Sequence, residues 1–557
     1  MSTQLKVYCQ NIGEYIPVEG GMTLSEIYRT VASRIGFTPI CARVNNKTED
    51  LNFPVFAPKM VEFLPVSSPS GQRCYTRSLC MMLYKAVTDL YPGARLVMEH
   101  SVSRGYYCRI TGDSVPSPAD AAPALCARMR EYVVRAIPFE RKERLTSDVI
   151  RIFEGQGLID KVKLLRTTHF LYTVYYRLDG ICDSYYGCLA PSTGILPVFN
   201  LIPYEDGYLL LGPDPADPSK PVVPVAQPKL YRAFTQYTKF NAVMGIRNAG
   251  DVNAVVEAGK TKMMINVAEA LHTKYIGAIA DNITARFNRG EARIVLIAGP
   301  SSSGKTTFTK RLAVQLLTNL VKPVMISLDN YFVDRHLTPR DEDGDYDYES
   351  LYSLNLPLFN DHLNRLVRGE EVELPTYNFE TGTSSFKGDK IRLDSRSVLL
   401  IEGIHGLNPE LTASVPDKMK YRIYVSALTT LSIDDHNWMS TTDNRLLRRI
   451  IRDYKYRGTP PLETIRRWPS VQRGEKKWIF PFQENADSMF NSSLLFEVGV
   501  MKEEAENVLK TVPHDVPEYA QAYRLRSILS CFAPISDKVI PPTSLLREFL
   551  GGSSFHY

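Results

Sequence analysis

Continuous apolar runs mark the C-terminal half of the chain. Arg293–Ala298 and Val398–Ile401 are such runs, and Pro323–Leu328 is similar. Runs of this kind are typical of parallel strands that are buried on both faces. Helical patterns lie between them, and alternating strands and helices indicate a doubly wound parallel sheet. We therefore predict an α/β domain over residues 291–500, followed by a helical segment over 501–557.

The first 66 residues show a shorter, mixed pattern. Gln4–Cys9 and Lys59–Leu64 are strand-like, because apolar and β-branched residues recur along them. Thr23–Glu26 has the spacing of a capping box and precedes an apolar-periodic run over Ile27–Ile35. This combination predicts a small α/β unit over residues 1–66.

Residues 70–212 form a second predicted unit, of α+β type. Thr76–Leu90 has helical periodicity. Gly105–Ile110 and Phe170–Arg177 are rich in tyrosine and β-branched residues, which favours strands.

A proline-rich stretch separates this unit from the α/β domain. Residues 213–228 carry six prolines, a composition typical of a semi-rigid linker. Asp251–Arg289 contains few helix breakers, so we predict a helix there. We assign residues 213–290 to a linker and a helical connector.

Composition narrows the class of protein. Of the 557 residues, 44% are hydrophobic and 23% are charged, as in ordinary globular proteins. The formal net charge of +5 is small for this length and does not by itself indicate binding to nucleic acid or to an anionic membrane. No apolar run approaches the roughly 20 residues of a membrane span, and the N-terminus lacks the layout of a signal peptide. We expect a cytoplasmic protein with no membrane partner, and we leave its oligomeric state open.

The cysteines are unevenly distributed. Eight of the nine lie before residue 190, with no CxxC pair and no repeated spacing. This arrangement is unlike a disulfide framework or a zinc ribbon, and it agrees with a cytoplasmic location.

The most specific motif in the chain predicts binding of ATP and Mg²⁺. Residues 299–306 match GxxxxGK[ST], follow an apolar strand and open a helix over Thr307–Leu317. In this motif backbone N–H groups surround the phosphates at a helix N-terminus. Lys305 should reach the β- and γ-phosphates, and the Thr306 hydroxyl should bind Mg²⁺. The predicted nucleotide-binding residues are Gly299, Pro300, Ser301, Ser302, Ser303, Gly304, Lys305, Thr306 and Thr307.

Two acidic residues follow predicted strands. Asp329 comes directly after the second strand, at the sheet edge where ligands bind in such folds, and it could accept the proton of an attacking hydroxyl. Glu402 ends the apolar run at Val398–Ile401, which is the position of a Walker B carboxylate that orders the Mg²⁺ ligands. The alternatives are an aspartate that caps the next turn and a glutamate with a structural role.

Four arginines are spaced to lie on one face of a helix. Steps of three and four residues place them within about a 100° arc. Such a face matches the negative charge of a triphosphate during phosphoryl transfer. The alternatives are a solvated basic helix or a set of intrahelical ion pairs. The four residues are Arg445, Arg448, Arg449 and Arg452, and Arg457 is a weaker candidate.

Together these segments resemble the uridine kinase and phosphoribulokinase family. The strand-end Asp329-Asn-Tyr331, the Glu402-Gly-Ile and the arginine-rich segment Asp443–Asp453 each match a family motif. The resemblance implies transfer of the γ-phosphate of ATP to a hydroxyl of a small acceptor, most simply a nucleoside. It also implies catalytic roles for Lys305 and Asp329 and for a lid that carries Arg448 and Arg449.

The same resemblance gives candidates for acceptor binding. Besides Asp329 and Tyr331, it implies that Asp347 binds the ribose hydroxyls and that Tyr377 stacks on the base. The family's base-binding histidine is replaced by Gly382, which removes one hydrogen-bond partner of the base. Uridine specificity therefore does not follow from the resemblance.

The N-terminal half resembles parts of a tRNA synthetase. Residues 1–66 are similar to a TGS domain, a β-grasp module. His100–Cys108 and Gly187–Gly194 are similar to the second additional (editing) domain of threonyl-tRNA synthetases. That family binds a metal through an HxxxH and a later Cys-x-x-x-His. The corresponding positions here are Arg73, Arg77, Met81, Cys188 and Ser192, so we expect an editing fold without metal, with Cys188 as a buried apolar residue.

Two rival functions remain open. One is a kinase of a sugar phosphate or another small metabolite. The other is a regulatory NTPase that senses tRNA or the ribosome through the N-terminal half, which would make RNA a partner.

Overall fold

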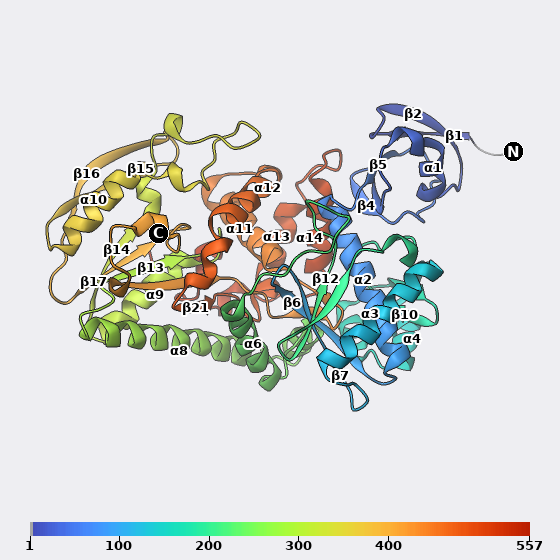
Figure 1. Ribbon diagram of the computed structural model, residues 1–557, viewed down its shortest axis with the longest axis horizontal. Coiled ribbons are helices and arrows are strands. Elements are labelled where there is room, and N and C mark those ends of the chain that lie inside the picture. Colours follow the sequence, from blue (N-terminus) through green and yellow to red (C-terminus); the bar gives the residue numbers. More distant parts are fainter. Residues whose placement is uncertain (1–3, 557) are drawn as a thin grey trace.

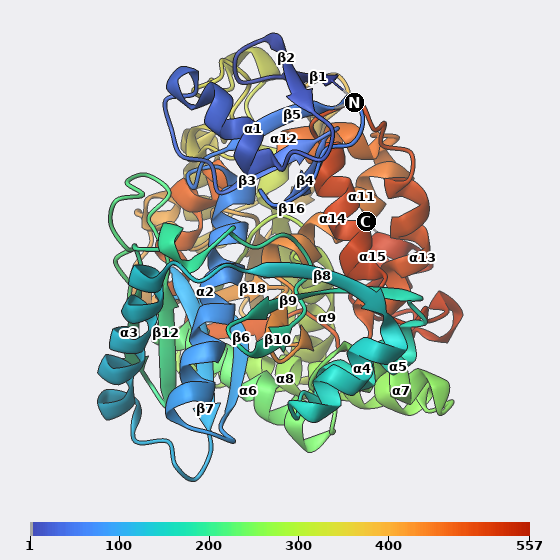
Figure 2. The ribbon, with the colours of Figure 1, turned by 90° about the vertical axis from the view of Figure 1, so that its right-hand side faces the viewer.

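The computed structural model describes residues 4–556, and its first part is a small unit of one five-stranded sheet and one α-helix (Figures 1 and 2). Five strands pair in the order β2-β1-β5-β3-β4, and the apolar face of helix α1 packs on them. The predicted capping box is present, because Thr23 and Glu26 exchange hydrogen bonds at the start of α1. The elements are β1 (Gln4–Cys9), β2 (Glu14–Glu19), α1 (Leu24–Val31), β3 (Cys41–Val44), β4 (Lys47–Glu49) and β5 (Met60–Leu64).

The central unit contains two antiparallel sheets on one long helix. The sheets have the orders β11-β12-β7-β6 and β10-β9-β8, and a single apolar core joins both to α2 (Pro69–Leu90). The remaining elements are β6 (Arg95–Val102), β7 (Gly105–Thr111), α3 (Pro118–Arg135), β8 (Glu140–Leu145), α4 (Thr146–Gly155), α5 (Ile159–Thr168), β9 (Tyr172–Leu178), β10 (Ile181–Asp183), β11 (Asn200–Tyr204) and β12 (Gly207–Leu211).

The connector differs from the predicted single helix. The helix expected over Asp251–Arg289 is two helices, α7 (Ala249–Glu257) and α8 (Thr261–Asn288), with a break at Gly259. Gly259 has φ +68°, a left-handed conformation that glycine adopts without strain. The proline-rich segment leads into α6 (Pro228–Val243), and its Val222 is buried against the core of the molecule.

The C-terminal domain is built on the predicted parallel sheet. All neighbouring strands are parallel, in the order β14-β17-β13-β18-β21. Apolar clusters cover both faces, with α8 and α9 on one and α10 on the other. The elements are β13 (Ile294–Ala298), α9 (Lys305–Thr318), β14 (Lys322–Ser327), α10 (Leu356–Val367), β17 (Ser397–Glu402), β18 (Lys420–Ser426) and β21 (Ser488–Asn491).

Additional elements surround this sheet. β15 (Val372–Asn378) and β16 (Thr383–Ile391) form a hairpin, and five helices follow: α11 (Thr441–Arg457), α12 (Pro461–Trp478), α13 (Glu497–Leu509), α14 (Tyr519–Leu529) and α15 (Arg547–Leu550). α13 spans the boundary predicted at residue 500, and Leu545 belongs to the core of the parallel sheet. The last residues are therefore part of this domain. Within residues 4–556 no helix is long and apolar enough to cross a membrane.

A short hairpin from the C-terminal domain enters the central unit. Its strands are β19 (Ser432–Asp434) and β20 (Asn437–Trp438). Lys161 of α5 is buried and pairs with Asp434 at 2.8 Å and with Asp183 at 2.9 Å. His436 Nδ1 lies 2.7 Å from the same Asp183. The two halves of the chain thus share a buried network of charged side chains.

Candidate active site

The phosphate-binding loop has the backbone that its sequence predicts. It runs from the end of β13 at Ala298 to the start of α9 at Lys305. Gly304 has φ +81°, which directs the chain into the helix. A Cβ atom on Gly299 would lie 1.9 Å from the Val425 carbonyl oxygen, so this position accepts glycine alone. The Lys305 ammonium donates to the Pro300 carbonyl at 3.3 Å and thus folds back over the loop.

Side-chain oxygen atoms that could bind Mg²⁺ meet at the carboxyl ends of β14 and β17. Parallel pairing places Ser327 of β14 beside Glu402 of β17. The Glu402 carboxylate accepts hydrogen bonds from Thr306 Oγ1 and from Ser327 Oγ, each at 3.3 Å. Burial and the nearby negative charge of Asp329 raise the pKa of Glu402 to about 7, against the opposing charge of Lys305. Oxygen ligands and excess negative charge fit a hard divalent cation.

Asp329 lies next to this pair on an exposed turn. Its backbone N–H donates to Ser327 Oγ at 3.4 Å, and its side chain is open to solvent. Because Asp329 and Lys305 both act on the Glu402 pKa, the three groups share one electrostatic environment. A carboxylate in this place can accept a proton from a hydroxyl that approaches the phosphates.

Two of the four arginines are buried beneath the phosphate-binding loop. Arg445 and Arg448 are 1% and 0% exposed. Arg445 pairs with Glu475 and donates to the Ser301 carbonyl at 3.1 Å. Arg448 pairs with Glu497. This differs from the expected lid, because side chains held in buried ion pairs within the packed helix α11 cannot close over a nucleotide from outside.

The other two arginines lie closer to solvent. Arg449 donates to Ser301 Oγ at 2.9 Å and to Asp453 at 3.2 Å, with 17% of its side chain exposed. Arg452 pairs with the same Asp453 at 3.1 Å. Arg457 also pairs with Asp453, at 3.4 Å. Of these candidates, Arg449 is the one that contacts the phosphate-binding loop with a partly exposed guanidinium.

The predicted acceptor residues are in different environments. Tyr331 is 1% exposed, and its hydroxyl lies 3.1 Å from His362 Nδ1, so it belongs to the core and is not open to an acceptor. Tyr377 is also buried, with its ring centroid 5.5 Å from that of Phe332. Asp347 is partly exposed, and its carboxylate accepts from the Glu349 N–H at 3.1 Å. Burial raises the Asp347 pKa.

The glycine that replaces the family histidine has a structural reason. Gly382 has φ +72° in the turn between β15 and β16. A Cβ atom there would lie 2.7 Å from Arg335, whose backbone N–H donates to the Gly382 carbonyl at 2.8 Å. Arg335 therefore occupies the space that a side chain at residue 382 would need.

Two carboxylates at the phosphate-binding loop escaped the sequence analysis. Glu475 of α12 accepts from the Ser301 N–H at 3.2 Å. Glu548 of α15 accepts from the Thr307 N–H at 3.3 Å and from its hydroxyl at 2.7 Å. They are 174 and 241 residues from their partners along the chain, and no sequence motif predicts either contact.

A family model and several relatives match parts of the chain. Residues 294–494 match the phosphoribulokinase / uridine kinase family. A uridine kinase of Staphylococcus epidermidis is 31% identical over 200 residues, which cover 35% of this chain and 86% of that protein.

The N-terminal half has a different relative. A threonine–tRNA ligase of Rubrobacter xylanophilus is 28% identical over 200 residues, in the N-terminal region of this chain. The match covers 35% of this chain but only 30% of the ligase, so the chain spans less than a third of that relative.

Solved structures also match part of this chain. A possible uridine kinase from Bacillus stearothermophilus is 18% identical and covers 36% of this chain and 89% of its own, with a TM-score of 0.25. The phosphate-binding loop, the strand-end acids and the match to uridine kinases along most of their length show that this chain belongs to the phosphoribulokinase / uridine kinase family.

Proposed function

We propose that the protein transfers the γ-phosphate of ATP to a hydroxyl of a nucleoside. The family implies ATP-dependent phosphoryl transfer to a small acceptor. The observation that carries the proposal is the meeting of Thr306, Glu402 and Asp329 at the carboxyl end of the sheet, beside Lys305.

Each group has a separate part in the reaction. The backbone of residues 299–306 surrounds the phosphates, and Lys305 turns from the Pro300 carbonyl to the transferred phosphoryl group. Thr306 and Glu402 would hold Mg²⁺, which neutralises charge on the phosphates when bound. Asp329 accepts the proton of the acceptor hydroxyl, and Arg449 reaches the phosphates from Ser301. Positioning and charge neutralisation supply most of the reduction of the barrier.

The nucleoside is supported by Asp347 and by the uridine kinase relatives, whereas uridine is not singled out. The partly exposed carboxylate of Asp347 has the chemistry to accept hydrogen bonds from ribose hydroxyls. Since Gly382 stands in place of the family's base-binding histidine and Arg335 occupies the space of its side chain, contacts with the base should discriminate less, or differently, among nucleosides.

The test is a panel of nucleosides and sugar phosphates with radiolabelled ATP and the full chain. We expect a labelled nucleoside monophosphate that is lost in Lys305→Ala. Asp329→Asn should lower kcat by about 10²- to 10⁴-fold while ATP still binds. The matched control is Asp361→Asn, which changes an exposed carboxylate on α10. Full turnover in Asp329→Asn would remove the proposed base.

The same panel separates the rival functions. Label transferred only to sugar phosphates would replace the nucleoside by another acceptor. Phosphate release without any acceptor, stimulated by RNA, would favour a regulatory NTPase.

A further inference from the structure

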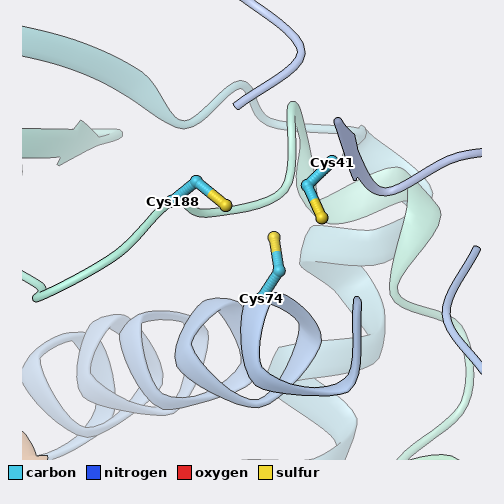
Figure 3. A group of neighbouring side chains, drawn as sticks. All are labelled: Cys41, Cys74 and Cys188. Atoms are coloured by element: carbon cyan, nitrogen blue, oxygen red, sulfur yellow. The ribbon is translucent and has the colours of Figure 1, made fainter. Parts of the chain in front are cut away.

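Three cysteine side chains converge at the contact between the N-terminal and central units. Figure 3 shows the sulfur atoms of Cys41, Cys74 and Cys188 pointing toward one another. Cys41 lies on β3, Cys74 on α2 and Cys188 in the loop after β10. All three sulfur atoms lie within 4.8 Å of one another. Among the described residues this is the one group of His, Cys, Asp and Glu side chains arranged in this way.

The spacing of the sulfur atoms is suited to a metal ion. Zinc–sulfur bonds of about 2.3 Å in a tetrahedral site place sulfur atoms roughly 3.8 Å apart. A group already within 4.8 Å needs only a small contraction to reach this distance. The thiols are also enclosed: Cys41 and Cys74 are 0% exposed and Cys188 is 6% exposed. A metal ion held here would be shielded from solvent, and its three thiolate ligands would leave one position of a tetrahedral zinc site for a fourth ligand.

A nearby guanidinium compensates the charge that the metal would leave. Three thiolates around a divalent cation carry a net charge of about −1, which is costly to bury alone. Arg77 donates to the Cys188 carbonyl at 2.9 and 3.2 Å, and its Nη2 lies 4.0 Å from Cys188 Sγ. Gly187 makes room for it, because a Cβ atom there would lie 2.6 Å from Arg77 Cζ.

We propose that Cys41, Cys74 and Cys188 bind one thiophilic metal ion, Zn²⁺ or Cu⁺, which joins the N-terminal unit to the central unit. Thiolate ligands select these ions over Mg²⁺ or Ca²⁺. The ligand set differs from that of the tRNA synthetase editing domain. Cys188 is the one position in common, whereas Cys74 lies outside the HxxxH positions and Cys41 belongs to the preceding N-terminal unit. We predicted a metal-free domain because Cys188 alone is kept at the editing-domain positions; Cys41 and Cys74 lie outside those positions.

Metal analysis of the full chain tests the proposal. The chain is purified without chelators, and its metal content is measured by mass spectrometry. We expect close to one zinc or copper ion per chain, and the element identified distinguishes the two. Cys74→Ser and Cys188→Ser should reduce the content at least tenfold. The control is Cys80→Ser, which changes a fully buried thiol of the same helix outside the cluster.

Two measurements on the unaltered chain keep the test independent of how the variants fold. Addition of Co²⁺ to chelator-treated protein should produce the intense near-ultraviolet absorption of cobalt–thiolate bonds. Removal of the metal should lower the melting temperature. Protein with neither zinc nor copper that also fails to bind Co²⁺ would overturn the proposal, as would a native disulfide between two of the three cysteines. Neither outcome bears on the kinase proposal, whose residues lie in the C-terminal domain.

Discussion

Glu548 accepts hydrogen bonds from groups that could instead donate to a phosphate. Its carboxylate accepts from the backbone N–H and hydroxyl of Thr307, in the first turn of α9. The N–H groups of a first helical turn have no partner inside the helix, and they bind anions readily. A nucleotide phosphate and the Glu548 carboxylate therefore compete for the same place.

We expect Glu548→Gln to tighten ATP binding. Removing one negative charge from a helix N-terminus changes the competition by about 1 kcal/mol, or roughly fivefold in Kd. Titration calorimetry with ATP measures the change, and Glu503→Gln on the exposed face of α13 is the control. Weaker binding in Glu548→Gln would instead show that this carboxylate helps to hold the nucleotide or its cation.

Glu349 is a carboxylate whose pKa is raised by burial. Its Oε2 is buried without a hydrogen-bond partner among the described residues. Burial raises its pKa to about 7, while Arg449 and Lys305 oppose the shift and Glu475 adds to it. The unfolded chain has the ordinary pKa near 4.3. The folded state thus holds the proton more tightly, so stability falls as the pH rises from about 4 to 7 and then levels off.

Glu349→Gln should remove this pH dependence. At pH 8 without nucleotide, we expect the variant to be more stable than the parent by about 3–4 kcal/mol, and at pH 4 we expect little difference. Urea unfolding at both pH values measures this, with the exposed Glu342→Gln as the control. An equal effect of Glu349→Gln at both pH values would contradict the assigned pKa.

Helix α11 divides its arginines between two tasks. Its apolar face contributes to the main C-terminal core, and Arg448 is buried beside that face against Glu497 of α13. Arg449, one position later, is turned by about 100° and reaches Ser301 of the phosphate-binding loop. One helix therefore supports the loop from inside and contacts it from the solvent side.

The two positions should respond differently to the same substitution. Arg448→Met leaves Glu497 as an unpaired buried charge, which costs about 3–5 kcal/mol of stability. Arg449→Met should leave the melting temperature nearly unchanged but lower kcat/KM by about tenfold or more. Thermal unfolding and steady-state kinetics compare the pair, and each variant serves as the control of the other. Equal losses of stability would contradict this division.

Across the whole molecule, a buried charge network joins the two halves. Burial by itself would lower the pKa of Lys161, but Asp183 and Asp434 raise it overall, so the ammonium is charged inside the protein. Asp183 belongs to the central unit and Asp434 to the hairpin of the C-terminal domain. The pairing therefore requires both halves to be folded and in contact.

Lys161→Met should weaken this contact. Two aspartates would lose their shared cation, and we expect a loss of about 3–5 kcal/mol together with faster proteolysis of residues 432–438. Urea unfolding and timed proteolysis provide the measurements. Lys142→Met, which changes a more exposed lysine on β8, is the control. Unaltered stability in Lys161→Met would mean that apolar packing alone holds the halves together.

The sequence predicts what depends on local pattern and misses what depends on distant contacts. The predicted strands that end near Ser327 and Glu402 are confirmed. They were predictable because buried parallel strands are continuous apolar runs in the sequence. The break at Gly259 was missed, since one glycine inside a helical pattern is often tolerated. Helical spacing placed the arginines on one face, but which of them are buried depends on Glu475 and Glu497, which no local signal connects to α11.

The inserted hairpin also limits how the polypeptide can be divided. An excised catalytic half that began at residue 291 would carry Ile433 and Asp434 into water, without the neighbours that enclose them. It would also lose α6 and α8, which pack beside β21. Domains that look separable along the chain are therefore interlocked in space. Phosphoryl transfer by this protein should therefore be assayed with the full chain, because a truncated chain that lacks activity has also lost packing contacts of the catalytic domain.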